Sequence, residues 1–331
     1  MPATFGLPDA PPGVTPEWAF AGAKSSSFGS THDGTAKIEV FGVHGEYFCI
    51  SGPGKGEQGV ELKPKLRGMI DAPVKSLWLP GAYGQSFVDF RWERRDVVFT
   101  VFIFAEDDDP ETWHTIDSKW RFAFDYVKET TIRFTTSDGY RDLRVRLIEE
   151  PEVYESGEWE GRDPHLDACS TAVMTCAAEL PFYVGPSDFY EWEGTGSVGR
   201  QTFKLNVDCD VPVWPKWTLT DQARWRLPDF SWGNQEYARG IADAGRTVEL
   251  PFLPKGAGCV ADSDPRMQTL LAANRMHLQG LWKGQDLLYP VAGGTYSKIP
   301  VAVRDAVDGF ALRLEVPKWY TRPWSRPIGV V

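Results

Sequence analysis

Short runs that alternate between apolar and polar residues, separated by turns, dominate this sequence. In the clearest run, TTIRFTTSDGYRDLRVRLIEE, Ile132 and Phe134 precede an S-D-G turn, and Leu143, Val145 and Leu147 follow it. Residues two apart point to the same face of a strand, so this run predicts a β-hairpin with one buried face. The chain of 331 residues also holds 25 Pro and 32 Gly, which end strands more often than they lie inside helices. We therefore expect a mainly β protein.

Two segments show the period of a helix instead. In AEDDDPETWHTIDSKWRFAF, Asp109 precedes Pro110, as an N-cap precedes a proline at the first helical position. Apolar residues then recur on one stripe, at Trp113, Ile116, Trp120 and Phe124. This segment predicts a helix over about 110–127. A weaker helical period marks residues 266–280, RMQTLLAANRMHLQG.

Composition and pattern divide the chain into an arm and two domains. Residues 1–35 are rich in Pro, Gly and Ser and predict an extended N-terminal arm that is ordered only if something holds it. Residues 36–186 predict a β-rich domain around the helix, with a strand from Val97 to Ala105 that is covered on both faces. Residues 187–331 predict a β-sandwich of jelly-roll or galectin type. A boundary near Glu150 is the alternative.

Charge and cysteine content restrict the functions open to the chain. Its 35 basic and 46 acidic side chains give a net charge of −11, so we expect no nucleic-acid binding. Five cysteines, at positions 49, 169, 176, 209 and 259, form no C-x-x-C pair and predict free thiols. Cys169 and Cys176 would meet on a hairpin, although a reducing cytoplasm disfavours a bond. We find no signal peptide and no apolar run of ~18 residues, and expect assembly in a cytoplasm without a membrane span.

Candidate catalytic and metal sites each have a simpler structural interpretation. Acids at 107, 108, 111 and 117 would hold a metal with His114 only if they converged, and acids before a helix also favour its dipole. The two G-x-G-x-x-G matches, from Gly54 and Gly194, run into strand-like sequence and not into the helix of a dinucleotide site. Glu191 and Glu193 are the best pair for glycan hydrolysis, before Glu158 and Glu160, but charges also protect exposed strands. We expect no enzymatic activity and no cofactor.

Two groups of side chains favour binding. Four tryptophans would form a sugar platform, although a place in a core or interface is the favoured interpretation: Trp214, Trp217, Trp225 and Trp232. Two groups of arginines, the second on the polar face of its strand, predict a surface that meets another copy of the chain: Arg91, Arg94, Arg95, Arg141, Arg144 and Arg146. The acidic loop 149–163 is their candidate partner, and solvated faces are the alternative.

The order of these features resembles the distal tail proteins and minor tail proteins of long-tailed bacteriophages. The strand RRDVVFTVFIFA, the helix after the acidic turn and the hairpin with DGYRDLRVRL follow the order of that family's belt domain, and AELPFYVG is similar to its closing strand. NVDCDVPVWPKWTL resembles the start of the family's galectin-like sandwich, with Asp208, Cys209 and Asp210 where the family has Gly-Asp. EVPKWYTRPWSRP is similar to the endings of minor tail proteins in phages of actinobacterial hosts.

The resemblance covers about Arg67 to Pro327 and implies a structural virion protein of the tail tip. It implies a hexameric ring, formed by the belt domain, that joins the tail tube to the baseplate or receptor-binding apparatus. The N-terminal arm, with Trp18, would order against a neighbouring subunit. The alternative is a carbohydrate-binding β-sandwich protein, or a glycan hydrolase, that contacts a glycan of the host cell wall.

Overall fold

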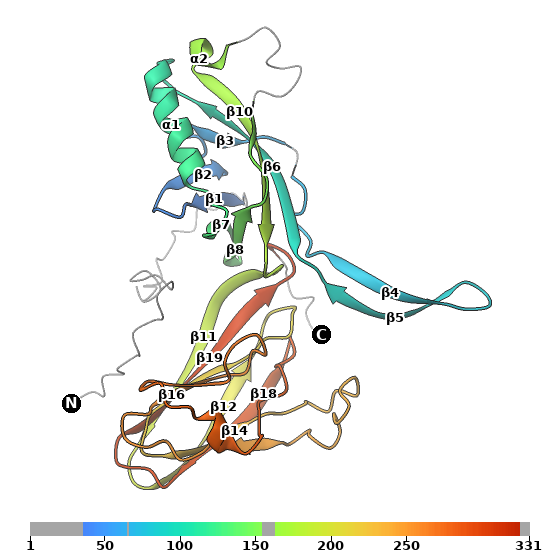
Figure 1. Ribbon diagram of the computed structural model, residues 1–331, viewed down its shortest axis with the longest axis vertical. Helices are drawn as coiled ribbons and strands as arrows, with labels where there is room; N and C mark the ends of the chain where they lie inside the picture. Colours follow the sequence, from blue (N-terminus) through green and yellow to red (C-terminus); the bar gives the residue numbers. More distant parts are fainter. Residues whose placement is uncertain (1–35, 65, 154–162, 325–331) are drawn as a thin grey trace. The chain divides into compact units, whose positions relative to one another are not determined.

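The structure is a computed structural model that describes residues 36–64, 66–153 and 163–324 (Figure 1). The described residues form two compact units. The first unit holds residues 36–186 together with 319–324, and the second holds residues 187–318. Strands prevail in both units, so the prediction of a mainly β protein is confirmed. The sequence predicts 187–331 as one domain, whereas residues 319–324 belong to the first unit.

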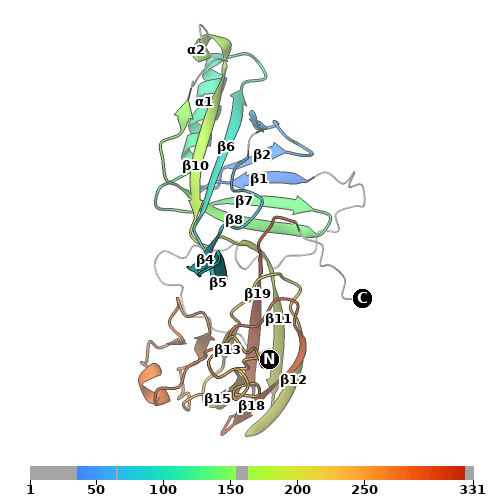
Figure 2. The ribbon, with the colours of Figure 1, turned by 90° about the vertical axis from the view of Figure 1, so that its right-hand side faces the viewer.

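The first unit is built on antiparallel strands in the order β2-β1-β7-β8-β10-β6-β3, with β9 beside β10 and the start of β11 beside β8 (Figure 2). Their bounds are Lys37–Phe41 for β1, Tyr47–Ser51 for β2, Val60–Leu62 for β3, Arg95–Phe104 for β6, Thr130–Thr136 for β7, Gly139–Leu147 for β8, Glu152–Val153 for β9, Cys169–Ala178 for β10 and Tyr183–Gly194 for β11. One face of β6 is fully buried and the other is mostly half-buried. The sequence predicts that this strand is covered on both faces, whereas only one face is fully buried.

Helix α1, Pro110–Phe122, packs against two of these strands through its apolar stripe. Trp113 and Trp120 are buried, and the Trp120 ring lies 5.1 Å from Phe48 of β2 and 6.4 Å from Phe99 of β6 between centroids. The predicted stripe therefore forms the contact between helix and sheet. The short helix α2, Pro164–Asp167, lies beside α1.

Both ends of α1 are set by aspartates. The Asp109 carboxylate accepts a hydrogen bond from the Thr112 backbone N–H at 3.1 Å, which confirms the predicted N-cap. The helix ends at Phe122 and not near 127. The reason is that the Asp125 carboxylate accepts from the Lys128 backbone N–H at 2.9 Å and bends the chain into a turn.

The predicted hairpin is formed by β7 and β8. Ile132 and Phe134 on β7 and Leu143 and Val145 on β8 are buried, so the alternation does place one face in the core. Gly139 closes the turn with a φ of 108°, a conformation that favours glycine.

The second unit is a sandwich of two antiparallel sheets, in the orders β17-β16-β13-β19-β11 and β12-β18-β14-β15. The Trp225 ring of the second sheet lies 6.0 Å from the Trp192 ring and 5.9 Å from the Phe310 ring of the first sheet, between centroids. The inner faces of the two sheets therefore meet in one core. The bounds are Val198–Asn206 for β12, Lys216–Leu219 for β13, Arg224–Pro228 for β14, Thr247–Glu249 for β15, Cys259–Asp262 for β16, Leu270–Ala272 for β17, Gln279–Trp282 for the 3-10 helix η2, Tyr296–Arg304 for β18 and Phe310–Tyr320 for β19.

Residues 266–280 do not form the weakly predicted helix. Leu270 and Ala272 are buried and Leu271 is exposed, because this segment is strand β17 paired with β16. A turn follows, in which Arg275 has a φ of 61°. A short apolar cluster fits a strand as well as a helix, and pairing with a neighbouring strand decides between them.

The glycine motifs and the cysteines take structural places. Gly54 lies in a run of turns that leads into strand β3, and Gly194 ends strand β11 before β12, so neither motif precedes a helix. Cys169 and Cys176 lie on the single strand β10 and not on two strands of a hairpin. Seven residues of strand span roughly 23 Å, which is too far for a disulfide bond.

Candidate assembly surface

A two-stranded hairpin stands away from the rest of the first unit (Figure 1). Strand β4, Val74–Pro80, pairs with β5, Gln85–Trp92, and this sheet contains only these two strands. Every residue of both strands is exposed. A two-stranded sheet without further packing is only marginally stable in water.

One face of this hairpin carries a stripe of aromatic rings. Trp78 lies across from Phe87, with 5.4 Å between ring centroids, and Phe90 lies 5.4 Å from Trp92. Trp92 in turn meets Phe182 of the body of the unit at 5.1 Å. We call Trp78, Phe87, Phe90 and Trp92 the aromatic stripe; their exposed fractions are 52%, 54%, 45% and 36%.

Among the described residues, the hairpin holds the densest group of exposed apolar side chains. Isolated exposed apolar residues are ordinary, whereas a contiguous patch marks an interaction surface. Large aromatic side chains bury about 150–250 Å² each, so half-exposed ones in this number present on the order of several hundred Å². The exposed group consists of Val74, Leu77, Trp78, Leu79, Tyr83, Phe87, Val88, Phe90 and Trp92.

Of the six arginines predicted at a subunit interface, three are exposed and Arg146 is half-buried. Arg91 is on the hairpin beside Glu93, at 3.3 Å, and Arg94 pairs with Asp96 at 2.8 Å. Arg144 is exposed. Arg146 pairs with acidic side chains of its own unit, Glu129 at 3.4 Å and Glu179 at 2.9 Å. Most of these charges therefore have local partners.

Arg95 does not lie at the surface. It is fully buried, and its guanidinium donates to the carbonyl oxygens of Met69 at 3.2 Å and Thr321 at 2.7 Å. The guanidinium also lies 4.9 Å from the centre of the Tyr183 ring. Burial lowers the pKa of Arg95. This arginine holds its own unit together and is removed from the predicted surface.

Arg141 is also buried, which corrects its predicted place on the polar face of the hairpin strand. It has the odd numbering of Leu143 and Val145 and therefore faces inward with them. Its guanidinium lies 3.6 Å from the centre of the Tyr320 ring and donates to the Arg322 carbonyl oxygen at 2.9 Å. Arg95 and Arg141 together hold the C-terminal segment in the first unit.

The four tryptophans do not share an exposed face. Trp217 and Trp225 are buried in the sandwich core, at 2% and 0% exposure, whereas Trp214 and Trp232 are half-buried. Trp217 and Trp232 line a pocket of about 20 Å³, which holds about one water molecule and no sugar ring. Two of the four rings are thus unavailable to a ligand.

Two of the acidic candidates form ion pairs within the fold. Asp117 pairs with Arg121 at 2.6 Å, and Glu191 pairs with Arg313 at 3.2 Å. The His114 Nε2 atom lies 2.8 Å from the Nδ1 atom of His165. Within the described part of the chain, no three His, Cys, Asp or Glu side chains are grouped to hold a metal ion. Trp18, Glu158 and Glu160 lie outside the described residues.

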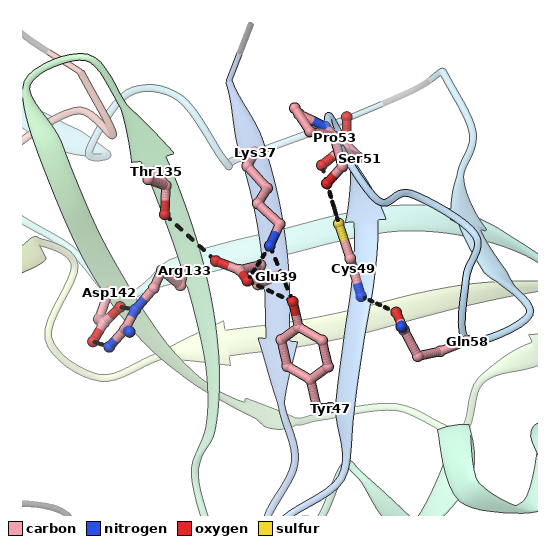
Figure 3. Close-up of polar contacts among 10 residues, drawn as sticks. All are labelled: Lys37, Glu39, Tyr47, Cys49, Ser51, Pro53, Gln58, Arg133, Thr135 and Asp142. Atoms are coloured by element: carbon pink, nitrogen blue, oxygen red, sulfur yellow. Dashed lines mark hydrogen bonds and ion pairs between the residues drawn. The ribbon is translucent and has the colours of Figure 1, made fainter. Parts of the chain in front are cut away.

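A polar network covers the outer face of the sheet that contains β1, β2 and β7 (Figure 3). Glu39 accepts hydrogen bonds from Lys37 at 2.7 Å, from Tyr47 at 2.6 Å and from Thr135 at 3.4 Å. Burial lowers the pKa of Lys37, but its bonds to Glu39 and Tyr47 outweigh burial and raise that pKa overall. The charged side chains on this face hydrogen-bond to one another. The exposed side chains of the β4–β5 hairpin are largely apolar instead.

The sequence held one signal for the hairpin that composition does not reveal. The residues PGAYGQ separate two runs rich in Trp, Phe, Leu and Val, which is the pattern of two strands and a turn. From the sequence, these apolar residues would be assigned to the core. A pattern alone does not distinguish a strand face that is buried in the core from one that is exposed.

Known proteins with similar sequences come from phage tails. No family model matches the chain. The minor tail proteins Gp27 of Mycobacterium phages L5 and D29 are 27% and 26% identical to it, over 88% of this chain and 98% of each relative. Among solved structures, the Dit protein (gp 19.1) of SPP1 superposes with a TM-score of 0.52 at 9% identity, covering 86% of this chain and 99% of that one. The resemblance read from the sequence is confirmed: the chain is a homologue of the mycobacteriophage minor tail protein Gp27 and has the fold of a phage Dit protein.

Proposed function

We propose that this chain is a structural component of a phage virion, located at the tip of the tail. The observation that carries the proposal is the alignment with the Gp27 minor tail proteins, which spans 88% of this chain and 98% of each relative. Because the alignment covers both units, the likeness concerns the whole architecture and not one shared domain. The fold of the SPP1 Dit protein, described as a hub of the adsorption apparatus, supports the same role.

In this role, copies of the chain form a hexameric ring around the tail axis. A contact between two different surfaces of the same protein produces a ring when the rotation closes. The first unit supplies the ring, because it carries the exposed β4–β5 hairpin. The partners are the tail tube protein on one side and the baseplate or receptor-binding proteins on the other.

The work of the protein is geometric and not catalytic. Two of the acids that suggested metal chemistry or glycan hydrolysis, Asp117 and Glu191, are partners of arginines within the fold. The carbohydrate-binding alternative loses its main support, because Trp217 and Trp225 are core residues. None of the helices in the described ranges is long and apolar enough to cross a membrane.

Labelling of intact virions tests this proposal. Gold-conjugated antibodies raised against the purified chain are expected to mark the distal end of the tail in electron micrographs. Label along the tail tube, on the capsid, or on no part of purified virions would contradict it. A control antibody against the major tail tube protein should mark the length of the tail.

A further inference from the structure

We propose that the second unit binds a linear anionic polysaccharide, of the kind displayed on a cell surface, across the solvent face of its sheet β12-β18-β14-β15. The residues of this face alternate along each strand with residues that are buried in the sandwich core. The inference goes beyond the structural role proposed above and does not depend on the ring. We call six residues the basic face: Arg200, Lys204, Arg224, Arg226, Lys298 and Arg304.

The basic face has the opposite charge to the chain that carries it. The whole chain has a net charge of −11, whereas Glu249 is the single acidic residue in these four strands. Five of the six basic side chains are exposed, and Arg224 is half-buried. Charges of one sign that lie together produce a local potential even on a protein of opposite net charge. This face therefore attracts anions.

The cations are spread along the strands and not gathered at one point. A strand rises about 3.3 Å per residue, so Arg200 and Lys204 are about 13 Å apart along β12. Lys298 and Arg304 are about 20 Å apart along β18 by the same measure. Neighbouring strands lie about 4.8 Å apart, which gives the three strands with cations a width of about 10 Å. An extended polymer with repeated charges fits this surface better than one small anion does.

Two pairs of cations face each other across neighbouring strands. Lys204 is directly opposite Lys298, and Arg224 is directly opposite Arg304. Like charges in opposite positions destabilise an antiparallel pair of strands. Glu249 relieves the arginine pair, at 2.5 Å from Arg304 and 3.9 Å from Arg224. Among the described residues, neither lysine of the other pair has an acidic partner, so an anion from outside the chain would stabilise them.

The composition of the face argues against a protein or a nucleic acid as the partner. Protein interfaces have an apolar core and contain few lysines, whereas Thr202, Pro300 and Ala302 lie in the middle of this face. Single-stranded nucleic acids stack on several aromatic rings, but these four strands expose one ring, that of Tyr296. A duplex carries one charge per about 1.7 Å, and the acidic remainder of the chain repels so dense a charge.

Polar side chains between the cations suit a sugar polymer. Thr202 and Asn206 are exposed on β12, and their hydroxyl and amide groups can form hydrogen bonds with sugar hydroxyls. The Tyr296 ring, 74% exposed, offers an apolar surface with a polar tip beside them. This face is separate from the core that holds Trp217 and Trp225.

Binding to defined polymers tests the inference. Fluorescence anisotropy measures the affinity of the full chain for labelled polygalacturonate, phosphorylated dextran and neutral dextran. We expect both anionic polymers to bind and neutral dextran not to bind. The affinity should fall by about tenfold or more between about 0.01 M and 0.15 M salt, because salt screens exposed charges. No binding to either anionic polymer, or equal binding to neutral dextran, overturns the inference and leaves the location at the tail tip untouched.

Removal of the lysine pair tests the surface. The double variant Lys204→Gln/Lys298→Gln should bind about fivefold more weakly or less, as expected for the loss of two exposed charges. Lys255→Gln/Lys283→Gln is the matched control, because it removes the same charge from exposed loop positions of the same unit. The control should change the affinity less than about twofold. Equal weakening in the two variants would show attraction to the whole chain and overturn the basic face.

A charge reversal separates binding from folding. Lys204→Glu places a carboxylate opposite Lys298, so the unfolding midpoint should rise while the affinity for the anionic polymers falls. Unchanged affinity would overturn the inference. A lower affinity together with a lower midpoint would indicate a folding defect, and would overturn the interpretation of the lysine pair as a site for an anion.

Two further polymers test the class of the partner. Poly-glutamate represents an acidic protein segment, and single-stranded and duplex DNA represent nucleic acids. At equal concentrations of charge we expect each to bind more weakly than the anionic polysaccharides, since none offers sugar hydroxyls to Thr202 and Asn206 at a matching density of charge. Tighter binding of poly-glutamate or of DNA would overturn a polysaccharide as the occupant.

Discussion

Arg95 and Thr321 lie 226 positions apart in the sequence, yet the Arg95 Nη2 atom donates to the Thr321 carbonyl oxygen at 2.7 Å. The same guanidinium donates to the Met69 carbonyl oxygen at 3.2 Å. Tyr183 donates its hydroxyl to that carbonyl as well, at 2.6 Å. One buried cation therefore joins the C-terminal segment to the interior of the first unit.

Replacing Arg95 should destabilise the protein. Arg95→Ala removes two charge-assisted hydrogen bonds and the packing of the guanidinium on the Tyr183 ring, so we expect a loss of about 3 kcal/mol in the free energy of unfolding. Arg95→Lys should recover only part of it, because an ammonium cannot reproduce the fork of the guanidinium. Denaturant titration measures both. Arg94→Ala, at an exposed neighbour, is the control, and an equal effect of the two alanine variants would contradict a role inside the fold.

Removal of the C-terminal segment should affect the first unit. A chain that ends at Lys318 lacks the Thr321 and Arg322 carbonyl oxygens, which accept from Arg95 and Arg141. It also lacks the Trp319 ring, which stacks on Phe182 at 6.0 Å between centroids. We expect its stability to fall by at least about 3 kcal/mol. Thermal unfolding followed by circular dichroism tests this, with a chain that ends at Trp324 as the control. Equal melting temperatures of the two truncated chains would show that 319–324 contribute nothing.

The N-cap of α1 offers a smaller and more local test. Asp109→Ala removes the acceptor of the Thr112 backbone N–H and should cost about 1 kcal/mol of stability. Asp109→Ser should retain most of it, since serine also caps helices. Glu106→Ala, which precedes the cap, is the matched control. Indistinguishable unfolding curves for Asp109→Ala and the wild type would argue against the cap.

Stability should decline at low pH through Glu249. Burial alone would raise the pKa of this carboxyl, but hydrogen bonds and charge from Arg304 and Arg226 outweigh burial and lower that pKa below its ordinary value of 4.5. Since the folded pKa lies below the unfolded one, the ionised group stabilises the fold above about pH 4.5, and this contribution is lost as pH falls through the folded pKa. Glu249→Gln should flatten the acid side of a pH–stability curve, whereas Glu193→Gln, on an exposed strand, should not. Parallel curves for all three proteins would contradict this.

Local patterns in the sequence were sufficient to predict the elements that depend on interactions between nearby residues. The cap at Asp109, the stripe of Trp113 and Trp120, and the β7–β8 hairpin depend on residues a few positions apart. The same period of two also indicates that Arg141 faces inward, because it lies two residues from the buried Leu143 on one strand. These features follow from backbone geometry and need no partner from elsewhere in the chain.

Features that depend on contacts between residues far apart in the sequence could not be predicted. Residues 270–272 form strand β17 because β16 lies beside them, which no local pattern indicates. The link from Arg95 to Thr321 joins segments 226 positions apart. The exposure of Trp78 and Phe87 was also hidden, because an aromatic strand reads as core until the fold shows that nothing covers it.

The native mass of the purified chain tests the central claim, self-association into a ring, most directly. Light scattering over a concentration series, at low and high salt, should find one discrete species of about six copies, as expected for a closed head-to-tail ring. That species should persist as salt rises, because the exposed side chains of the β4–β5 hairpin are largely apolar. A monomer at every concentration, or a dimer that grows no further, would contradict the account.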